Sequence, residues 1–432
     1  MSALQIEYKD PNQLKSRGPQ ARTHGRRQIK QIAASIKEFG FVNPALIDRD
    51  NRIIVGHGRV EGAKLLGMRE IPTVCVDHLT PEQVRAYVIA DNRLAELAGW
   101  DRNLLALELK ELAIQSDFDV NVTGFETAEI DILINELNEA SLDDADDPPE
   151  IDQTAQPISL LGDIWKVGGH YLLCGSALEP ESYGRLLGQR KAQLVFTDPP
   201  YNLPIARTLR TPSARRREFA MASGEMSDDE YVRFLSTTSG YLCAASDDGS
   251  IHYICIDWRH VGGLLNAALE HYTELKNICV WIKNNAGMGS LYRSQHELIC
   301  VFKNGTAPHV NNVELGRFGR GRSNVWPYAS PISFGKAHQA RIDHPTIKPL
   351  ALVADAIMDC SARGDIVLDA FAGSGTTLLA AQRTGRIGYG IEIDGRYVDA
   401  TLKRFHDVYG LTAVHLRTNK SFEQIARERS MR

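Results

Sequence analysis

The sequence predicts an α/β protein whose largest domain is an open sheet, and three stretches predict it. Residues 194–196 form a short apolar run that stops at a double proline, as a buried strand does when it ends abruptly. Residues 366–381 have the pattern of a strand, a glycine turn and the start of a helix. Residues 387–394 form the next strand, with acids at its end. Chemistry in such a sheet collects beyond the carboxyl ends of the strands, so a site is predicted there.

The bulk composition is that of an ordinary globular protein. At 432 residues, with 43% hydrophobic and 24% charged residues, the chain is long enough for two or three domains. No apolar run approaches the roughly 20 residues of a membrane span, and the polar start of the chain does not resemble a signal peptide. The 7 cysteines are scattered without a Cys-x-x-Cys pair, which indicates reduced thiols in a cytoplasmic protein and argues against a zinc site.

The formal net charge of −5 does not indicate nucleic-acid binding, but the distribution of the charges does. Arginines gather in two loop segments of the C-terminal half, and both clusters suit phosphate contacts: Arg207, Arg210, Arg215, Arg216 and Arg217, and Arg317, Arg320 and Arg322. The alternative is that these arginines are merely solvated. Residues 139–157 are acidic, contain three prolines and lack periodicity, which is typical of a linker.

The N-terminal region predicts a small α/β module, because short apolar strands follow stretches with helical spacing. Its expected elements are, in order, a helix at 29–39, strands at 44–48 and 52–55, a helix at 56–66 and a strand at 71–76. Gly40 is expected to close the first helix.

This module resembles the ParB/sulfiredoxin-like fold through the stretches 43–44, 54–59, 63–67 and 71–72. The resemblance implies a nucleotide phosphate at the turn that opens the second helix, with an arginine and the helix N-terminus as partners: Gly56, His57 and Arg59. The alternative is a turn that only caps its own helix. Some members of that family are described as nucleases, but this module has no carboxylate cluster that would hold a catalytic metal.

The remaining elements follow from periodicity and turn residues. Helices are expected at 81–97, 104–114 and 128–137, before the linker. The large domain is expected to contain a hairpin at 162–170, strands at 171–176, 250–256, 277–282 and 298–302, and helices at 228–240 and 397–408. Residues 304–343 are rich in Gly, Arg, Asn and aromatics and lack periodicity. The expected domains are a module at 1–80, a helical extension at 81–138, the linker at 139–157 and the large domain at 158–425.

The tetrapeptide that follows the strand at 194–196 suits recognition of an amine. Pro199 and Pro200 stiffen the loop and leave carbonyl oxygens that only accept hydrogen bonds. Asp198 adds a second acceptor, and Tyr201 adds a flat ring. An exocyclic amine of a nucleobase would donate to the Asp198 carboxylate and the Pro199 carbonyl. The alternative is an ordinary strand-to-turn junction, since Asp-Pro and Pro-Pro are common turn dipeptides.

The glycine turn predicts a nucleoside site without a phosphate. No Gly-Lys-Ser/Thr ends the turn, so it is not a P-loop, and Leu378 stands at the third glycine position of a dinucleotide fingerprint. An acid after the second strand of such a unit, here Glu392, commonly binds a ribose diol. A cofactor with adenosine but no phosphate fits both observations, and S-adenosylmethionine is such a cofactor.

Three motifs together resemble the DNA amino-methyltransferases that modify adenine N6 or cytosine N4, and they lie at 198–201, 344–349 and 371–377. Their order, with the catalytic motif first and the cofactor turn later, is that of the β group of this family. The resemblance implies a Rossmann-like, S-adenosylmethionine-dependent methyltransferase sheet with permuted motif order. It places the target-recognition segment at 304–343.

The resemblance also implies site residues. The catalytic ones are Asp198, Pro199, Pro200 and Tyr201. The cofactor-binding ones are Ser176, Lys348, Pro349, Asp369, Phe371, Gly373, Ser374, Gly375, Thr376, Thr377 and Glu392. Lys348 and Pro349 are expected near the methionine part of the cofactor. Many family members carry Asp where this chain has Ser176, which brings no charge to that contact.

The implied reaction is methylation of adenine N6 in double-stranded DNA, with the target base swung out of the helix. Adenine is preferred because a leading Asp in the tetrapeptide favours it in the family, and cytosine N4 is the alternative. Two further alternatives are a ParB-like DNA-binding or partition protein with a vestigial site, and a methyltransferase for RNA or a protein amide. Further partners to consider are a nucleotide at the N-terminal module and a second copy of the chain.

Overall fold

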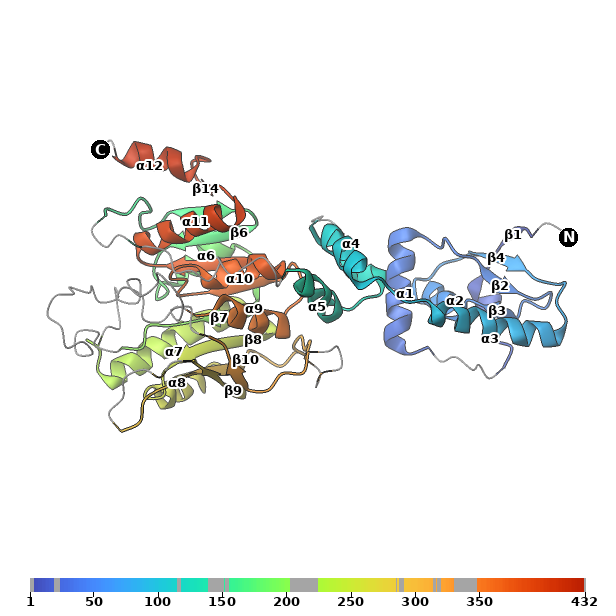
Figure 1. Cartoon of the computed structure of the whole chain (residues 1–432), viewed down its shortest axis with the longest axis horizontal. Coiled ribbons are helices and arrows are strands. Elements are labelled where there is room, and N and C mark those ends of the chain that lie inside the picture. The colour runs from blue at the N-terminus through green and yellow to red at the C-terminus, as the bar shows by residue number, and fades with distance from the viewer. Residues whose placement is uncertain are drawn as a thin grey trace. The chain divides into compact units, whose positions relative to one another are not determined.

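The computed structural model describes residues 4–18, 24–114, 118–138, 151, 155–202, 224–284, 286, 291–313, 316, 320–329 and 348–430. The chain divides into two compact units, Met1–Leu137 and Asn138–Arg432 (Figure 1). Most of the expected linker at 139–157 lies outside the described residues.

The N-terminal unit is built on a four-stranded sheet. Its strands, in spatial order, are β1 (Ile6–Lys9), β4 (Ile71–Cys75), β2 (Ala45–Ile47) and β3 (Ile53–Val55). β2 and β3 form the predicted antiparallel hairpin, and its turn places Asn51 at a φ of 58°, a left-handed conformation that Asn tolerates. β2 and β4 are parallel, and β1 pairs with β4 in the antiparallel sense.

Two helices of this unit pack closely because glycines line their contact. These are α1 (Arg26–Phe39) and α2 (His57–Leu65), and a short 3₁₀ turn η1 (Pro11–Gln13) precedes them. A Cβ atom on Gly58 would lie 2.8 Å from the Ile32 side chain, and one on Gly62 would lie 3.2 Å from it. α1 ends at Gly40, with a φ of 80°, as the sequence predicts.

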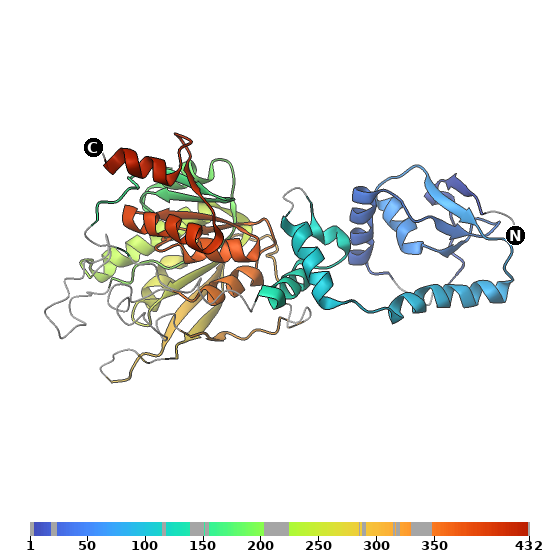
Figure 2. The ribbon, with the colours of Figure 1, turned by 45° about the horizontal axis from the view of Figure 1, so that its top comes forward.

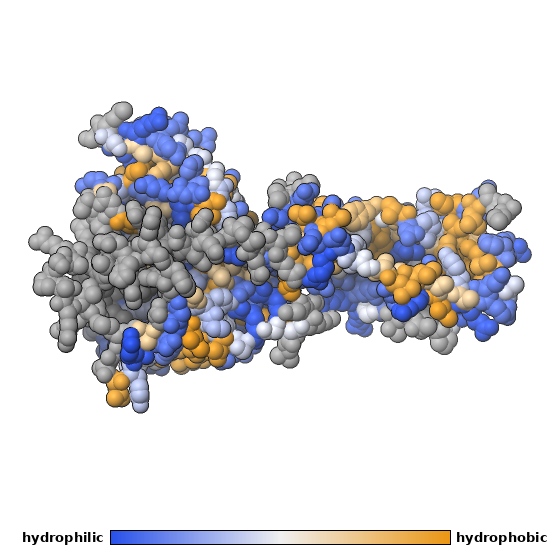
Figure 3. Space-filling view, in the orientation of Figure 1, coloured by the Kyte–Doolittle hydropathy of each residue, from blue (hydrophilic) through white to orange (hydrophobic). Residues whose placement is uncertain are grey.

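Three more helices complete the N-terminal unit. α3 (Pro81–Leu97) begins with a capping box between Thr80 and Gln83 and runs as one long ribbon in Figure 2. α4 (Arg102–Ile114), η2 (Val120–Thr123) and α5 (Thr127–Asn138) share a small core of their own. Several large apolar side chains of α3, of α4 and of the segment between them are exposed: Ile89, Leu94, Leu97, Trp100 and Leu104. Figure 3 shows orange, apolar areas on the visible face of this unit.

The C-terminal unit is built on a ten-stranded sheet. Its strands, in spatial order, are β11 (Val325–Pro327), β9 (Glu274–Ile282), β10 (His296–Lys303), β8 (Ser246–Ile256), β7 (Ala192–Thr197), β12 (Ile366–Asp369), β13 (Ile387–Glu392), β6 (His170–Cys174), β5 (Ile164–Val167) and β14 (Ala413–His415).

The centre of this sheet is parallel and its flanks are largely antiparallel. β8, β7, β12, β13 and β6 run in the same direction, so their carboxyl ends share one edge. β10 is antiparallel to both β8 and β9. The start of β10 and the end of β9 therefore lie at that same edge.

Helices cover both faces of the sheet (Figures 1 and 2). They are α6 (Pro180–Leu187), α7 (Asp228–Ala244), α8 (Val261–Ala268), α9 (Leu350–Asp359), α10 (Thr376–Thr384), α11 (Gly395–Tyr409) and α12 (Phe422–Ser430). Leu194 and Phe196 of β7 pack in one core with α9 and α10, whereas Val195 packs in another core with α6. Because β7 is buried on both faces, its sequence is a continuous apolar run, and the predicted buried strand is confirmed.

All seven cysteines are free thiols. In the part of the chain that the structure describes, no helix has both the length and the apolar character that a membrane crossing needs.

Candidate functional site

The tetrapeptide 198–201 and the glycine turn 373–375 lie at the same sheet edge, since β7 and β12 are neighbouring parallel strands. Thr197, the last residue of β7, donates its hydroxyl to the Asp369 carboxylate at the end of β12 (2.8 Å). Tyr231 of α7 donates to the Pro200 carbonyl (2.9 Å), which holds the loop against the helix. The two segments that the sequence assigns to one site therefore follow neighbouring strands whose last residues are hydrogen-bonded to each other.

The Asp198 carboxylate lies in a cluster of titratable side chains. Its two oxygens accept hydrogen bonds from the Tyr201 hydroxyl (2.6 Å) and the Lys348 ammonium (2.6 Å). The Lys348 ammonium also pairs with Glu297 (2.9 Å), and the other Glu297 oxygen accepts from Lys283. We call these five residues the carboxylate–lysine cluster: Asp198, Tyr201, Lys283, Glu297 and Lys348.

Asp198 is the carboxylate of this cluster that is partly exposed, and Lys283 is the partly exposed cation (22%). The Asp198 side chain is 24% exposed, whereas those of Lys348 and Glu297 are 4% and 8% exposed. Tyr201 is also buried, so its ring presents little surface for stacking in this conformation. Of the two carboxylates in the cluster, the more accessible one is therefore Asp198, which the sequence analysis assigns to amine recognition.

Burial and neighbouring charges act in opposite directions on these groups. Burial raises the pKa of Asp198, and the charge of Lys348 only partly offsets it. Burial would also raise the pKa of Glu297, but Lys348 and Lys283 lower it to about 2. Burial and the Asp198 charge raise the pKa of Tyr201, which stays a neutral hydrogen-bond donor.

Sequence reasoning missed Glu297 and Lys283. Glu297 is the second residue of β10 and Lys283 follows β9, so the antiparallel pairing of these strands brings both to the candidate site. The only signal in the sequence was a lysine just after one expected strand and a glutamate just before the next. Lys348, which the sequence analysis assigned to the methionine part of the cofactor, has its ammonium on Asp198 and Glu297, and its cofactor contact stays a prediction.

The glycine turn is held by Glu392 at the end of β13. One Glu392 oxygen accepts from the Gly373 amide (2.8 Å) and the other from the Asp394 amide (2.8 Å). Burial raises the pKa of Glu392 to about 7. Burial likewise raises the pKa of Asp369 to about 6, although the Phe371 amide donates to its carboxylate (3.0 Å).

The turn itself is tight on one side and open on the other. Gly375 has a φ of 82°, and a Cβ there would lie 2.4 Å from the Thr401 side chain. Gly373 has a φ of 51°, and the nearest atom to such a Cβ is 4.0 Å away. Arg404 donates to the Ser374 carbonyl (3.0 Å) and to the Thr376 hydroxyl (3.3 Å), which braces the start of α10.

These residues fit an adenosine-type cofactor better than a phosphate. A carboxylate at the end of β13, beside an open glycine, offers acceptors that a ribose diol can use. Ser176 lies in the adjoining turn, where its hydroxyl accepts from the Leu178 amide (3.2 Å) and the Gly175 amide donates to the Glu392 carbonyl (2.9 Å). Thr377 is buried in α10, and Pro349 precedes α9.

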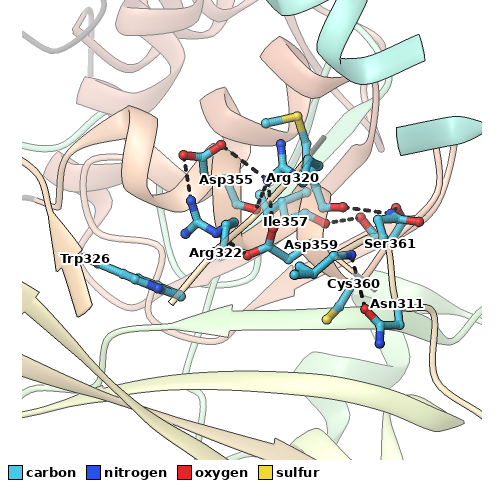
Figure 4. Close-up of polar contacts among 12 residues, drawn as sticks. Asn311, Arg320, Arg322, Trp326, Asp355, Ile357, Asp359, Cys360 and Ser361 are labelled. Atoms are coloured by element: carbon cyan, nitrogen blue, oxygen red, sulfur yellow. Dashed lines mark hydrogen bonds and ion pairs between the residues drawn. The ribbon is translucent and has the colours of Figure 1, made fainter. Parts of the chain in front are cut away.

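The structure gives Arg320 and Arg322 partners within the protein. Arg320 pairs with Asp359 (2.7 Å) and Asp355 (3.4 Å), and Arg322 pairs with the same two residues (2.7 Å and 3.0 Å). Figure 4 shows both guanidinium groups pointing at these carboxylates of α9, with Arg322 above the ring of Trp326. We call the four ion-paired residues, Arg320, Arg322, Asp355 and Asp359, the arginine clamp. Phosphate contacts by its arginines, as the sequence analysis expects, would compete with these buried ion pairs.

The other arginines assigned to phosphate contacts lie outside the described residues: Arg207, Arg210, Arg215, Arg216, Arg217 and Arg317. Asn202, with a φ of 51°, is the last described residue before the arginine-rich segment. Its side chain bonds to the backbone of Gly224 (3.0 Å) and Met226 (2.8 Å). The two ends of that segment are therefore tied together beside Tyr201.

In the N-terminal unit, the predicted nucleotide turn has the expected geometry. Gly56 precedes α2 with a φ of 100°, and Arg59 reaches back to the Pro44 carbonyl (3.4 Å). Within the described part of the chain, the buried His57 Nε2 and Arg59 Nε atoms have no hydrogen-bond partner. Burial lowers the pKa of both side chains.

Comparisons with known proteins match three family models to successive parts of the chain. A "ParB N-terminal domain" matches residues 2–92, a "ParB-methyltransferase HTH domain" matches 103–160, and a "DNA methylase" matches 192–403. The sequence analysis describes α4 and α5 only as a helical extension, so it missed the second of these matches.

Individual relatives match the two halves separately. The ParB-like nuclease domain-containing protein YnaK of Escherichia coli is 44% identical over 80 residues, which are 18% of this chain and 92% of that protein. The type II methyltransferase M.HpaI of Haemophilus parainfluenzae is 24% identical over 247 residues, 54% of this chain and 73% of that protein. The solved M1.HpyAVI–SAM complex is 23% identical, with a TM-score of 0.41, over 54% of this chain and 98% of that one.

Proposed function

Because the chain belongs to the N6/N4 DNA methylase family and carries a ParB-type N-terminal domain, we propose that it methylates the N6 amine of adenine in duplex DNA. The chain is a DNA methyltransferase, and its cofactor is S-adenosylmethionine. The choice of adenine, the duplex substrate and the residue roles below are the proposal.

One observation carries the residue assignment. The partly exposed Asp198 carboxylate stands at the end of β7, and Thr197 bonds directly to Asp369 beside the glycine turn. An amine held by Asp198 and a nucleoside held near Glu392 would therefore meet at one sheet edge. Positioning of two reactants in this way is a large part of catalysis when no covalent intermediate is needed.

The reaction needs acceptors for the amine and little else from the protein. When bound, S-adenosylmethionine supplies a methyl group on a positively charged sulfur and retains the electrons of the broken C–S bond as a neutral thioether. The amine lone pair forms the new N–C bond, and one N–H proton leaves afterwards to solvent. Asp198 orients the amine and stabilises the positive charge that develops on nitrogen. Glu392 holds the ribose diol of the cofactor.

The target base has to leave the duplex to reach Asp198, at a cost of a few kcal/mol. The arginine-rich segment 203–223 begins and ends beside Tyr201, a suitable place for phosphate contacts next to an extruded base. The match to a ParB-methyltransferase HTH domain at 103–160 supports a second DNA contact. A duplex substrate is accordingly favoured over RNA or a protein amide.

The N-terminal domain is proposed to bind a nucleotide at Gly56, His57 and Arg59. The αL turn before α2 and the unpartnered buried His57 and Arg59 atoms among the described residues support this. We also propose that the protein works in the cytoplasm, and that a homodimer is the assembly to test first.

The test is methyl transfer from labelled S-adenosylmethionine to unmodified duplex DNA, followed by nucleoside analysis of the product. N6-methyladenine is the expected product, and Asp198→Ala is expected to abolish it without loss of cofactor binding. If the product is N4-methylcytosine, the target base is cytosine and the choice of adenine is refuted. Equal transfer by wild-type protein and Asp198→Ala would refute the role of Asp198.

A further inference from the structure

The Lys348 ammonium has two carboxylate partners, and only one of them is proposed to touch substrate. It lies 2.6 Å from Asp198 and 2.9 Å from Glu297, and the Tyr201 hydroxyl is 3.2 Å away. All three of its hydrogens thus have an acceptor. Glu297 in turn is held on its other oxygen by Lys283.

A lysine bound to Asp198 alone would oppose the proposed reaction. Asp198 must present negative charge to a nitrogen that becomes cationic, and a full positive charge on the same carboxylate would cancel much of it. It would also repel the cation that forms. The presence of Lys348 therefore requires a second anion close by, and Glu297 is that anion.

We propose that Glu297 is a positioning residue for the reaction, which acts as the second counter-ion of Lys348 so that the Asp198 carboxylate remains available to the amine. Lys283 keeps Glu297 ionised and fixed from the outer side. The inference rests on the proposed function, because it assigns Glu297 a role toward the same amine.

The geometry supports separate roles for the two carboxylates, with Asp198 facing the amine and Glu297 pairing with Lys348. Glu297 is 8% exposed and is the second residue of β10, so its position is set by the sheet rather than by a loop. The rings of Trp281 and Tyr201 lie 5.9 Å and 5.5 Å from the Lys348 ammonium, and Trp281 also supports Lys283 (4.7 Å). The lysine is consequently held between its two carboxylates with little freedom to move onto Asp198 alone.

The pKa of each group depends on the others. Burial alone would lower the pKa of Lys348, but Asp198 and Glu297 raise it, so it stays charged. Besides burial and Lys348, the negative charge of Glu297 affects Asp198 and raises its pKa. Among the described residues, the other titratable groups that interact with Asp198 are Tyr201, Tyr231 of α7, Cys255 of β8 and Asp369 of β12.

The test compares Glu297→Gln and Lys283→Met with wild type in single-turnover methyl transfer across pH 5 to 9, at saturating cofactor and DNA. Glu297→Gln is expected to slow the reaction by about 10²-fold, since misplaced catalytic groups commonly cost that much. In the pH–rate profile of Glu297→Gln, the fall in rate on the acid side, the acid limb, is expected to move to lower pH. The reason is that the negative charge of Glu297, which raises the pKa of Asp198, is gone. Lys283→Met is expected to slow the reaction less and to move the acid limb to higher pH.

Cofactor affinity, measured by equilibrium dialysis, is expected to stay within about threefold of wild type for both variants. The exposed residue Glu270 provides the matched control, Glu270→Gln, which should leave rate and pH profile unchanged. A slower Glu297→Gln reaction with an unmoved acid limb, or a rate within threefold of wild type, would overturn the inference. If Glu297→Gln does not fold, Lys283→Met alone tests the inference. A shift of the acid side of its pH–rate profile to higher pH supports the inference, and a shift to lower pH or no shift overturns it. Wild-type protein that transfers no methyl group to DNA would instead refute the proposed function.

Discussion

Two clusters of charged side chains in the C-terminal unit each combine two carboxylates with two cations, and they differ in which cation they use. In the carboxylate–lysine cluster, the carboxylates of Asp198 and Glu297 pair with Lys283 and Lys348, and the fifth member, Tyr201, is neutral. The arginine clamp joins Arg320 and Arg322 to Asp355 and Asp359 of α9. Each cluster has one partly exposed carboxylate, Asp198 (24%) or Asp355 (29%), and one buried carboxylate, Glu297 (8%) or Asp359 (7%), so the contrast lies in the cations.

The difference follows from the chemistry of the cations. A guanidinium is a planar fork with five donors, so two arginines can bridge two carboxylates and tie a loop to a helix. An ammonium is a compact point charge that can be shared between carboxylates without fixing their planes. The same number of charges therefore serves the architecture in one place and is suited to reactivity in the other.

The largest expected effect on stability is that of Asp359→Asn. It removes the carboxylate that pairs with both buried arginines, and breaking a buried pair in this way costs about 3–5 kcal/mol. Urea-induced unfolding followed by tryptophan fluorescence measures it. Asp407→Asn, on the exposed side of α11, is the control and should change the free energy of unfolding by less than about 0.5 kcal/mol. A loss below 1 kcal/mol for Asp359→Asn would mean that the clamp does not stabilise the fold.

Asp198→Asn should have the opposite effect to Asp359→Asn, with a large loss of methyl-transfer rate and a small loss of stability. The rate of methyl transfer is expected to fall by about 10²–10³-fold, as for loss of one preorganised electrostatic group. The free energy of unfolding should change less than in Asp359→Asn, because Lys348 keeps Glu297 as a partner. Single-turnover kinetics and the same urea titration measure both quantities. Equal destabilisation by Asp198→Asn and Asp359→Asn would contradict the claim that the two clusters have different roles.

Gly375→Ala tests whether the catalytic edge also depends on backbone strain. Both the φ of 82° and the 2.4 Å approach to Thr401 oppose a side chain, so a loss near 3 kcal/mol is expected, at the upper end for strained positions. Gly373→Ala is the matched comparison, with an expected loss of about 1 kcal/mol, because only its φ of 51° is unfavourable. Thermal unfolding of the two variants ranks them, and the reverse order would contradict the described turn.

The smallest expected effect is the pH dependence that Glu392 confers. Its pKa in the folded protein is about 7, above its ordinary value, so between about pH 5 and 7 the folded state binds more protons than the unfolded state. Stability should consequently fall as the pH rises through this range, by roughly 1 kcal/mol for a partly accessible group. Glu392→Gln should remove this component of the unfolding curves. An unchanged pH dependence would show that Glu392 is ionised throughout.

The sequence located the two segments of the site because their order along parallel strands is enough to do so. Strands that run in one direction end at one edge, so Asp198 and Glu392 had to approach each other once their strands were recognised. Many helix and strand positions of both units were predicted from apolar periodicity and glycine turns, but several short elements were missed: β1, α6, α8, β11, α9, β14 and α12. Element ends differed by a few residues, as for α7, which continues to Ala244.

The sequence did not reveal which charged residues are buried, because that depends on strand order. Glu297 and Lys283 reach the site through an antiparallel pair at the flank of the sheet, and no local pattern announces that pairing. Arg320 and Arg322 resemble solvated or phosphate-binding arginines in a glycine-rich stretch, and only the packing of α9 gives them carboxylate partners. Sequence patterns and the family resemblance thus predicted the fold class and pointed to the glycine turn and the tetrapeptide 198–201 as the candidate site. Tertiary structure alone decided the charge balance around Asp198, since ion pairs form between residues that are close in space and distant in the chain.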